Sequence, residues 1–311
     1  MPGPYAHITL LYELMQPIKL KLIFGASSEM MATLTTFFPY CVIGAVSPDY
    51  PNLAAGNTEA SQWSDAMHLT RASEMIASGI RRVRCSKGAV RDMQLAWLLG
   101  YCAHLATDMT IHPVVQAKVG DYAENQRQHR ICEMNQDSYI YRRMNLGEIG
   151  ESDFFAASVA QCSDSENRTR LDSDIVTLWE GMLEDVYPEL FIAQAPDCAS
   201  WHQGFVDRVS EYTKKKIRLF PLAGVIASKM ELPYPAYDLI DKQFIEDQLV
   251  PSKDPLLLHY DEIFDHAAGT VAMLWKQVKQ AIYADKLSAP PTFCDWNLDN
   301  GRNEHGNLVF W

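Results

Sequence analysis

Three ionisable side chains within one apolar segment constrain the fold of this chain more than any other feature. His104, Asp108 and His112 lie four residues apart within residues 98–113, most of which are apolar. In a helix of 3.6 residues per turn, this spacing places all three on one side. Burying a polar group without a partner is costly, so this side of the helix must face groups that satisfy it. Hydrogen-bonding neighbours or a bound cation would both do so.

Pro113 follows His112 directly and predicts where this helix ends. A proline disfavours the α conformation of the residue before it. We therefore expect the helix to stop at His112, whose side chain would then point in a different direction from those of His104 and Asp108.

Further histidines and acids occur before and after this segment. His129 and Glu133 repeat the four-residue spacing, and His7, Asp49 and His68 lie upstream. The chain has nine histidines, and five of them belong to this series. Histidine and carboxylate are ligands of catalytic zinc. The set is too large for one tetrahedral ion and suits a cluster of two or three.

The order of these residues resembles the zinc-dependent phospholipase C family, of which the S1/P1-type nucleases are more distant relatives. The resemblance covers roughly residues 1–145 and consists of His, Asp, His, His-x-x-x-Asp, His-Pro and His-x-x-x-Glu in that order. It implies an all-α fold, a multi-helix phospholipase C/P1 nuclease-like bundle. It also implies a centre of up to three Zn²⁺ ions that hydrolyses phosphate esters.

The resemblance implies how part of this set is shared among the zinc ions. His68, His104 and Asp108 would hold one ion, with Asp49 as a ligand or close neighbour. Asp108 would bridge to a third ion, which His7 and the amino terminus of the chain would complete. That terminus would be the Met1 amine or, after removal of the methionine, the nitrogen of the next residue.

A second ion would be held by His112, His129 and Glu133. In the secreted relatives, the gap between the bridging aspartate and the next histidine is longer than the gap from Asp108 to His112 here.

The ligand types favour hydrolysis over a structural role. Structural zinc sites usually have four protein ligands, mostly cysteines, and no Cys-x-x-Cys occurs here. Two zinc ions about 3.5–4 Å apart lower the pKa of a shared water towards about 7. Asp49 lies on a proline-bounded loop and is the candidate for orienting or deprotonating this water. Ser-Pro-Asp is also typical of a simple turn.

Tyr50 is a candidate for substrate binding. In the phospholipase branch of the family, an aromatic residue directly after the loop aspartate helps to line the head-group pocket, and Tyr50 has this position. A cation–π contact with a quaternary ammonium would contribute about 0.5–2 kcal/mol. Packing in the core is the alternative role.

Charge, cysteine content and hydropathy limit the class of protein. The net charge of −12 repels nucleic acid and anionic lipid, which argues against a nuclease. Seven scattered cysteines and no apparent signal peptide favour a cytoplasmic location. The longest apolar run, residues 31–46, is shorter than the roughly 20 residues of a membrane span. We expect no transmembrane segment, and a buried helix that leads to Asp49.

Helical patterns run through most of the chain, and we expect one helical domain at 1–285 and an irregular tail at 286–311. The apolar end of this tail is expected to pack rather than hang free. His202 and His305 show no evident partners in the sequence. Helices are predicted at 8–14, 27–38, 60–80, 90–112, 125–145, 174–186, 200–219, 235–249 and 257–285.

We therefore predict a zinc-dependent phosphodiester hydrolase. The leading substrate is a glycerophospholipid cut on the glycerol side of the phosphate, and peripheral contact with a membrane is compatible with it. The enzymatic alternative is a single-strand nuclease or 3′-nucleotidase of the S1/P1 type, with nucleic acid the less favoured partner. The non-enzymatic alternative is a helical interaction protein that zinc stabilises.

Overall fold

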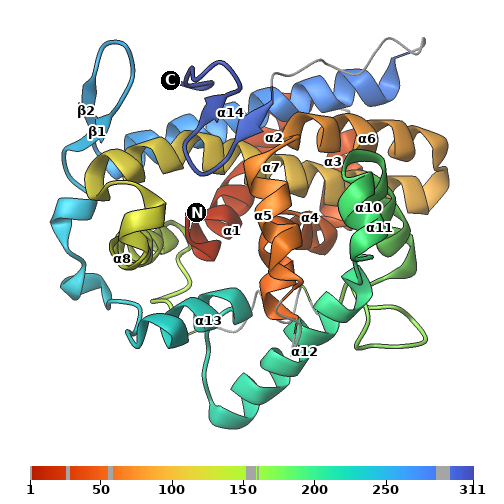
Figure 1. Cartoon of the computed structure of the whole chain (residues 1–311), viewed down its shortest axis with the longest axis horizontal. Helices are drawn as coiled ribbons and strands as arrows, with labels where there is room; N and C mark the ends of the chain where they lie inside the picture. The colour runs from red at the N-terminus through yellow and green to blue at the C-terminus, as the bar shows by residue number, and fades with distance from the viewer. Residues whose placement is uncertain (1, 26–28, 55–58, 152–158, 160, 285–294) are drawn as a thin grey trace.

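The chain folds into an all-α bundle in which two short hairpins are the β structure of the described residues (Figure 1). This confirms the predicted fold class. The computed structural model describes residues 2–25, 29–54, 59–151, 159, 161–284 and 295–311.

The first half of the chain provides most of the central helices. In order, it contains α1 (Pro4–Leu14), α2 (Pro17–Phe24), α3 (Glu29–Thr36), α4 (Phe38–Gly44), the 3-10 helix η1 (Ser47–Leu53), α5 (Ser61–Leu69), α6 (Ala72–Cys85), α7 (Gly88–Val119) and α8 (Tyr122–Tyr141).

The second half adds outer helices and both hairpins. In order, it contains η2 (Arg142–Met144), α10 (Ser173–Val186), α11 (Pro188–Ala193), α12 (Cys198–Lys215), α13 (Pro221–Met230), η3 (Tyr237–Leu239), η4 (Lys242–Phe244), β1 (Gln248–Val250), β2 (Leu256–Leu258), α14 (Tyr260–Tyr283), β3 (Trp296–Asn297) and β4 (Arg302–Asn303). The strands pair β1 with β2 and β3 with β4, both antiparallel.

Helix α7 forms the centre of the bundle. It has 32 residues, and every side chain from Met93 to Val115 is buried. A helix that is buried on all sides needs neighbours that cover its apolar side chains and satisfy its polar ones. Here α4, α6, α8 and α14 pack against it, with α14 running alongside (Figure 1). Among the described helices, none combines the length and apolar character needed to cross a membrane.

The prediction that the central helix ends at His112 is wrong, because α7 continues through Pro113 to Val119. A proline inside a helix removes the N–H that would bind the carbonyl four residues earlier. Residues much later in the sequence pack on this turn of the helix. Trp311 Nε1 donates to the carbonyl of Thr110 at 2.7 Å, close to the proline.

Other differences from the predicted helices have local causes. Residues 60–80 form two helices, because Arg71 has a left-handed φ of 56° between α5 and α6. The apolar run 31–46 divides at Phe37, since Pro39 lies in the first turn of α4 and favours a new helix start there.

The predicted helix at 235–249 is also wrong, because this stretch contains η3, η4 and β1. The Asp241 side chain accepts from the amide of Gln243 and so favours a tight turn over a longer helix.

Two glycines let α4 and α7 approach closely. A Cβ on Gly44 would overlap the carbonyl of Trp97, and a Cβ on Gly100 would overlap that of Cys41. Backbones can meet in this way only where side chains are absent. The close contact brings the carbonyl of Ala45, just after α4, within 2.9 Å of His104 Nδ1. Helix α4 leads into η1, which carries Asp49.

A buried histidine connects η1 to α12. His202 is fully buried, and its Nδ1 lies 3.0 Å from Tyr50 Oη. Its Nε2 lies 2.9 Å from Ser163 Oγ. The structure thus supplies two partners for a histidine that has no evident partner in the sequence. Burial lowers the pKa of His202 to about 4.

We predict that His202 destabilises the fold in mild acid. Its pKa falls from about 6.5 in the unfolded chain to about 4 in the folded chain, so between these values only the unfolded state binds the extra proton. Stability is therefore lost as the pH falls through this window. At about pH 5 the loss from this residue is about 2 kcal/mol.

Urea unfolding of the zinc-free protein at about pH 7.5 and about pH 5 measures this loss. His202→Gln keeps a side chain able to hydrogen-bond Tyr50 but cannot titrate, so it should lose less stability than wild type. Equal losses in both proteins would refute the assignment.

Candidate metal centre

Five elements bring the predicted ligands into one region of the bundle. All eight of these side chains are buried. They are His7 from α1, Asp49 from η1, His68 from α5, His104, Asp108 and His112 from α7, and His129 and Glu133 from α8.

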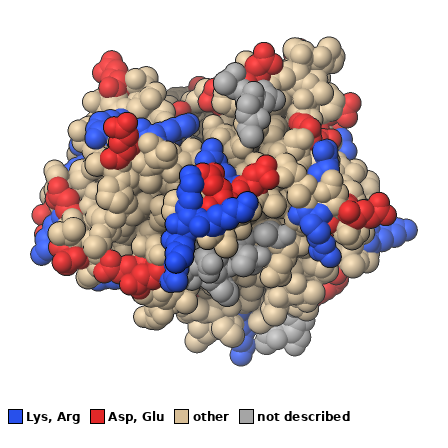
Figure 2. Space-filling view, turned by 90° about the horizontal axis from the view of Figure 1, so that it is seen from below, with Lys and Arg blue, Asp and Glu red and all other residues tan. Residues whose placement is uncertain are grey.

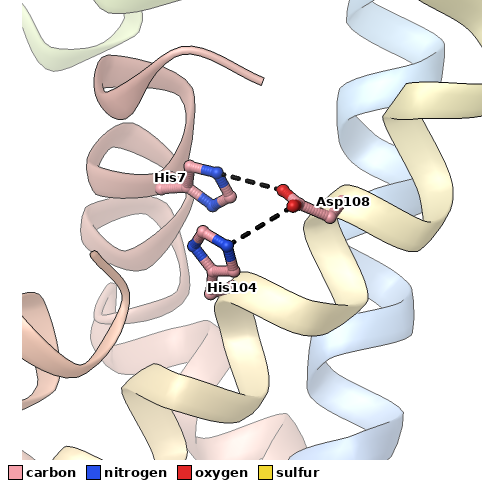
Figure 3. Close-up of side chains that lie close together, drawn as sticks. All are labelled: His7, His104 and Asp108. Atoms are coloured by element: carbon pink, nitrogen blue, oxygen red, sulfur yellow. Dashed lines mark ion pairs between the residues drawn. The ribbon is translucent and has the colours of Figure 1, made fainter. Parts of the chain in front are cut away.

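Asp108 lies at the middle of this arrangement. Its Oδ1 is 3.2 Å from His7 Nε2, and its Oδ2 is 3.3 Å from His104 Nε2 (Figure 3). His68 Nε2 approaches Oδ2 from another helix at 3.8 Å. The two carboxylate oxygens therefore face different imidazoles, which is the orientation of a carboxylate that bridges two cations.

Two compact sets of ligand atoms result. One set consists of His7, His104 and Asp108, and the other of Asp49, His68 and His104. Within each set, the ligand atoms lie within 4.8 Å of one another. His68 Nε2 is 3.8 Å from Asp49 Oδ1 and 3.2 Å from His104 Nε2. Bonds of about 2.0–2.1 Å in a tetrahedral site would space the ligand atoms about 3.3 Å apart. The observed separations are close to this spacing.

In each imidazole, the hydrogen bond that Nδ1 makes determines whether Nε2 can offer a lone pair to a metal ion. His68 Nδ1 lies 2.7 Å from the carbonyl of Ser64, and His104 Nδ1 lies 2.9 Å from that of Ala45. A carbonyl only accepts, so these nitrogens carry the protons. The two Nε2 atoms face each other at 3.2 Å, and each could offer a lone pair to a cation between them. Without a cation, burial lowers the pKa of His104, but the Asp108 carboxylate outweighs burial and raises this pKa above its ordinary value.

Several buried atoms here would be satisfied by such a cation. Within the described part of the chain, both nitrogens of His7, both carboxylate oxygens of Asp108 and Oδ1 of Asp49 lack a hydrogen bond of normal geometry. Each unsatisfied buried group costs about 1–3 kcal/mol. The residues present therefore fit zinc bound by histidine and carboxylate.

The electrostatics of Asp108 and His7 are consistent with ligation. Burial alone would raise the pKa of Asp108, but His104 and His112 hold it well below its ordinary value. Burial, together with the neighbouring His104, lowers the pKa of His7. An ionised carboxylate and a neutral imidazole are the forms that bind a metal ion.

The second predicted ligand set is less compact. His129 Nδ1 is 3.9 Å from Glu133 Oε1, while Arg130 Nη1 donates to Glu133 Oε2 at 2.9 Å. In the described ranges, His112, His129 and Glu133 do not all place a ligand atom within 4.8 Å of one another. Even so, His129 Nε2 lies 2.6 Å from the carbonyl of Gly120, which leaves Nδ1 directed inward.

Asp137 positions the start of the chain and was missed in the sequence. Its carboxylate accepts from the amides of Tyr5 at 3.3 Å and Ala6 at 2.7 Å, next to His7. A Cβ on Gly3 would overlap this carboxylate. The available signal was the continued four-residue spacing, since Asp137 follows Glu133 by four residues.

One family model matches the chain. It describes zinc dependent phospholipase C and aligns with residues 6–189, more than half of the sequence. The chain belongs to the zinc-dependent phospholipase C family. The aligned region contains all eight predicted ligands and ends before α12. No curated protein and no solved structure matches the chain.

A pocket of about 200 Å³ opens onto the centre of this phospholipase C family member. Asp49 and His68 reach its wall, as do Arg130 and Lys229. An apolar side is formed by α13 with Leu222, Val225, Ile226 and Met230. The remaining lining residues are Pro2, Pro4, Asn52, Ser64, Asp65, Leu69, Tyr122 and Asp299.

Tyr50 does not line this pocket. Its side chain is fully buried, its hydroxyl bonds His202, and its ring stacks on Phe205 with centroids 5.6 Å apart. The structure therefore places Tyr50 in the core, which is the alternative role considered for it. Its position offers no contact with a head group.

We predict that Gly3→Ala weakens zinc binding. The backbone of Gly3 has φ −65° and ψ 159°, which alanine adopts readily, so the added Cβ acts only through its overlap with Asp137. Displacing the start of α1 moves His7, and we expect zinc affinity to fall by about 10–100-fold. Chelator competition measures this affinity.

Gly269→Ala, which adds a Cβ to open space in α14, is the matched control. In an Asp137→Ala background, Gly3→Ala should have a much smaller effect, because the overlapping carboxylate is gone. Wild-type zinc affinity in Gly3→Ala would rule out this role for the Asp137 contact.

Proposed function

We propose that this protein is a phospholipase C-type hydrolase that cleaves a glycerophospholipid between glycerol and phosphate, using water activated by two or three zinc ions. One observation carries the proposal: the buried ligand cluster around Asp108 meets a pocket through Asp49 and His68. A structural zinc site would usually be closed by its protein ligands.

The proposed ligands divide as the observed contacts suggest. His68, His104 and Asp108 would hold one zinc ion, with Asp49 beside them, and His7 would join Asp108 at another. For a further ion, the family resemblance suggests His112, His129 and Glu133. When bound, zinc lowers the pKa of water and neutralises charge on a phosphodiester.

Asp49 is the residue to which we assign proton transfer. Its carboxylate lines the pocket, and its Oδ1 is buried without a hydrogen bond among the described residues. It comes from η1, outside the helical ligand pairs of α7 and α8. In this position it can orient the attacking water and accept its proton.

The pocket favours a phospholipid head group over a larger ligand. Arg130 and Lys229 supply positive charge for a phosphate in a chain whose net charge is −12. Its volume, about 200 Å³, is below the roughly 300–1,000 Å³ of pockets that enclose drug-sized ligands. The phosphate and head group would fit inside, while the acyl chains stay outside, along the apolar side formed by α13.

The S1/P1-type nuclease or 3′-nucleotidase is the second candidate and has less support. Single-strand binding usually combines a basic groove with aromatic side chains on which bases stack. Tyr122 is the one aromatic residue lining the described pocket. The face in Figure 2 mixes acidic side chains with basic ones. A purely structural zinc protein is disfavoured by the pocket beside the ligands.

The proposal is tested by hydrolysis of phosphatidylcholine in mixed micelles, single-stranded DNA and 3′-AMP, each with and without chelator. We expect chelator-sensitive release of diacylglycerol. Release of nucleoside or oligonucleotides without diacylglycerol would select the nuclease. A zinc-loaded protein inactive on all three would contradict both enzymatic functions.

In the same assay, we predict that Asp49→Asn lowers kcat by about 10²–10⁴-fold while zinc content stays near the wild-type value, because asparagine can still ligate through oxygen but cannot accept a proton. The matched control is Asp65→Asn, an acid in the same pocket outside the ligand set, which should change kcat little. Full activity in Asp49→Asn would show that another group takes the proton.

A further inference from the structure

The C-terminal segment, residues 295–311, contacts two of the proposed ligands directly. The amide of Leu298 donates to the carbonyl of His68 at 2.8 Å. The carbonyl of the same residue accepts from His112 Nδ1. Leu298 thus connects α5 to α7 at the centre. The segment lies well beyond the end of the family match at residue 189.

The segment also covers the part of α7 that Pro113 disturbs. Without an N–H at Pro113, the carbonyl of Met109 has no helical donor. Gly301 packs so closely here that a Cβ would overlap Pro113 and crowd the Met109 carbonyl. One residue along, Trp311 Nε1 donates to Thr110. The segment therefore packs on the turn of α7 that carries His112 and Pro113.

Contacts with α14 and within the segment hold it in place. The ring of Trp311 stacks on His266 with centroids 4.2 Å apart, and His266 Nε2 lies 2.7 Å from the carbonyl of Phe310. Trp296, which is buried, packs edge-on against Phe310. The carbonyl that meets His112 is therefore fixed by the bundle.

The Leu298 carbonyl determines which nitrogen of His112 is available. Because a carbonyl only accepts, His112 Nδ1 carries the proton and Nε2 carries the lone pair. That Nε2 is buried and, in the described residues, has no hydrogen-bond partner. His68 and His104 show the same pattern, with Nδ1 on a carbonyl and Nε2 turned inward. Such outer contacts fix the orientation of metal-binding histidines.

We propose that residues 295–311 are part of the metal centre, where Leu298 positions His112 and His68 for zinc. The segment acts through these histidines and also brings Asp299 to the pocket wall. The inference rests on the zinc centre proposed above. It assigns a role in zinc affinity to a part of the chain outside the region that matches the family.

Two glycines of the segment provide a matched test. Gly301 and Gly306 both have positive φ, 68° and 77°, so alanine introduces similar backbone strain at either position. A Cβ on Gly301 would push against Pro113, whereas a Cβ on Gly306 would meet no atom within 4 Å. The two variants therefore differ in whether the segment is moved off α7.

Zinc affinity is measured by chelator competition on the full chain, and urea unfolding of the zinc-free proteins reports stability separately. Gly301→Ala is expected to weaken the most loosely bound zinc by about 10–100-fold, and Gly306→Ala to leave it near the wild-type value. Trp311→Phe keeps an aromatic ring over His266 but removes the donor to Thr110, and should also lower the zinc affinity. If Gly301→Ala does not fold, the zinc affinity of Trp311→Phe tests the inference instead.

The possible outcomes separate this inference from the function. If wild type binds zinc and cleaves phospholipid, and Gly301→Ala and Trp311→Phe bind zinc as tightly as wild type does, the inference is wrong and the function stands. If Gly306→Ala lowers the zinc affinity as much as Gly301→Ala does, backbone strain rather than contact with α7 is responsible, and the inference also fails. A wild-type chain without zinc affinity would overturn both.

Discussion

The carboxylate of Asp108 is the constraint on which the rest of this structure depends. It is fully buried in α7, with His7 and His104 facing its two oxygens at 3.2 and 3.3 Å. His68 and His104 turn their Nε2 atoms towards the same space, since Nδ1 of each lies on a backbone carbonyl. Such a concentration of buried acceptors is unfavourable without compensating positive charge. Zinc, which the name of this chain's family indicates, would supply that charge.

The bundle is arranged so that distant segments meet at this carboxylate. Gly44 and Gly100 allow α4 to approach α7 closely, which brings η1 and Asp49 alongside. Asp137 holds the start of α1 in place. The C-terminal segment reaches the same centre through Leu298, which contacts His68 and His112. Elements from both ends of the sequence therefore converge on one central helix.

The spacing of His104 and Asp108 was sufficient to predict one buried polar face, because positions within one helix are related by local geometry alone. Other features depend on contacts between residues far apart in the sequence, which spacing does not reveal. The helix continues through Pro113 because a segment almost 200 residues later packs on it. Tyr50 is in the core rather than the pocket because His202 binds its hydroxyl. Asp137 had a local signal, the repeated spacing, but its partners are backbone amides.

X-ray diffraction recorded on both sides of the zinc absorption edge tests the central claim most directly. The account predicts one anomalous peak about 2.0–2.2 Å from the side chains of Asp108, His104 and His68, and a second peak at the same distance from Asp108 and His7. Crystals grown with zinc that show no peak near Asp108, and water or protonated imidazole in its place, would contradict it.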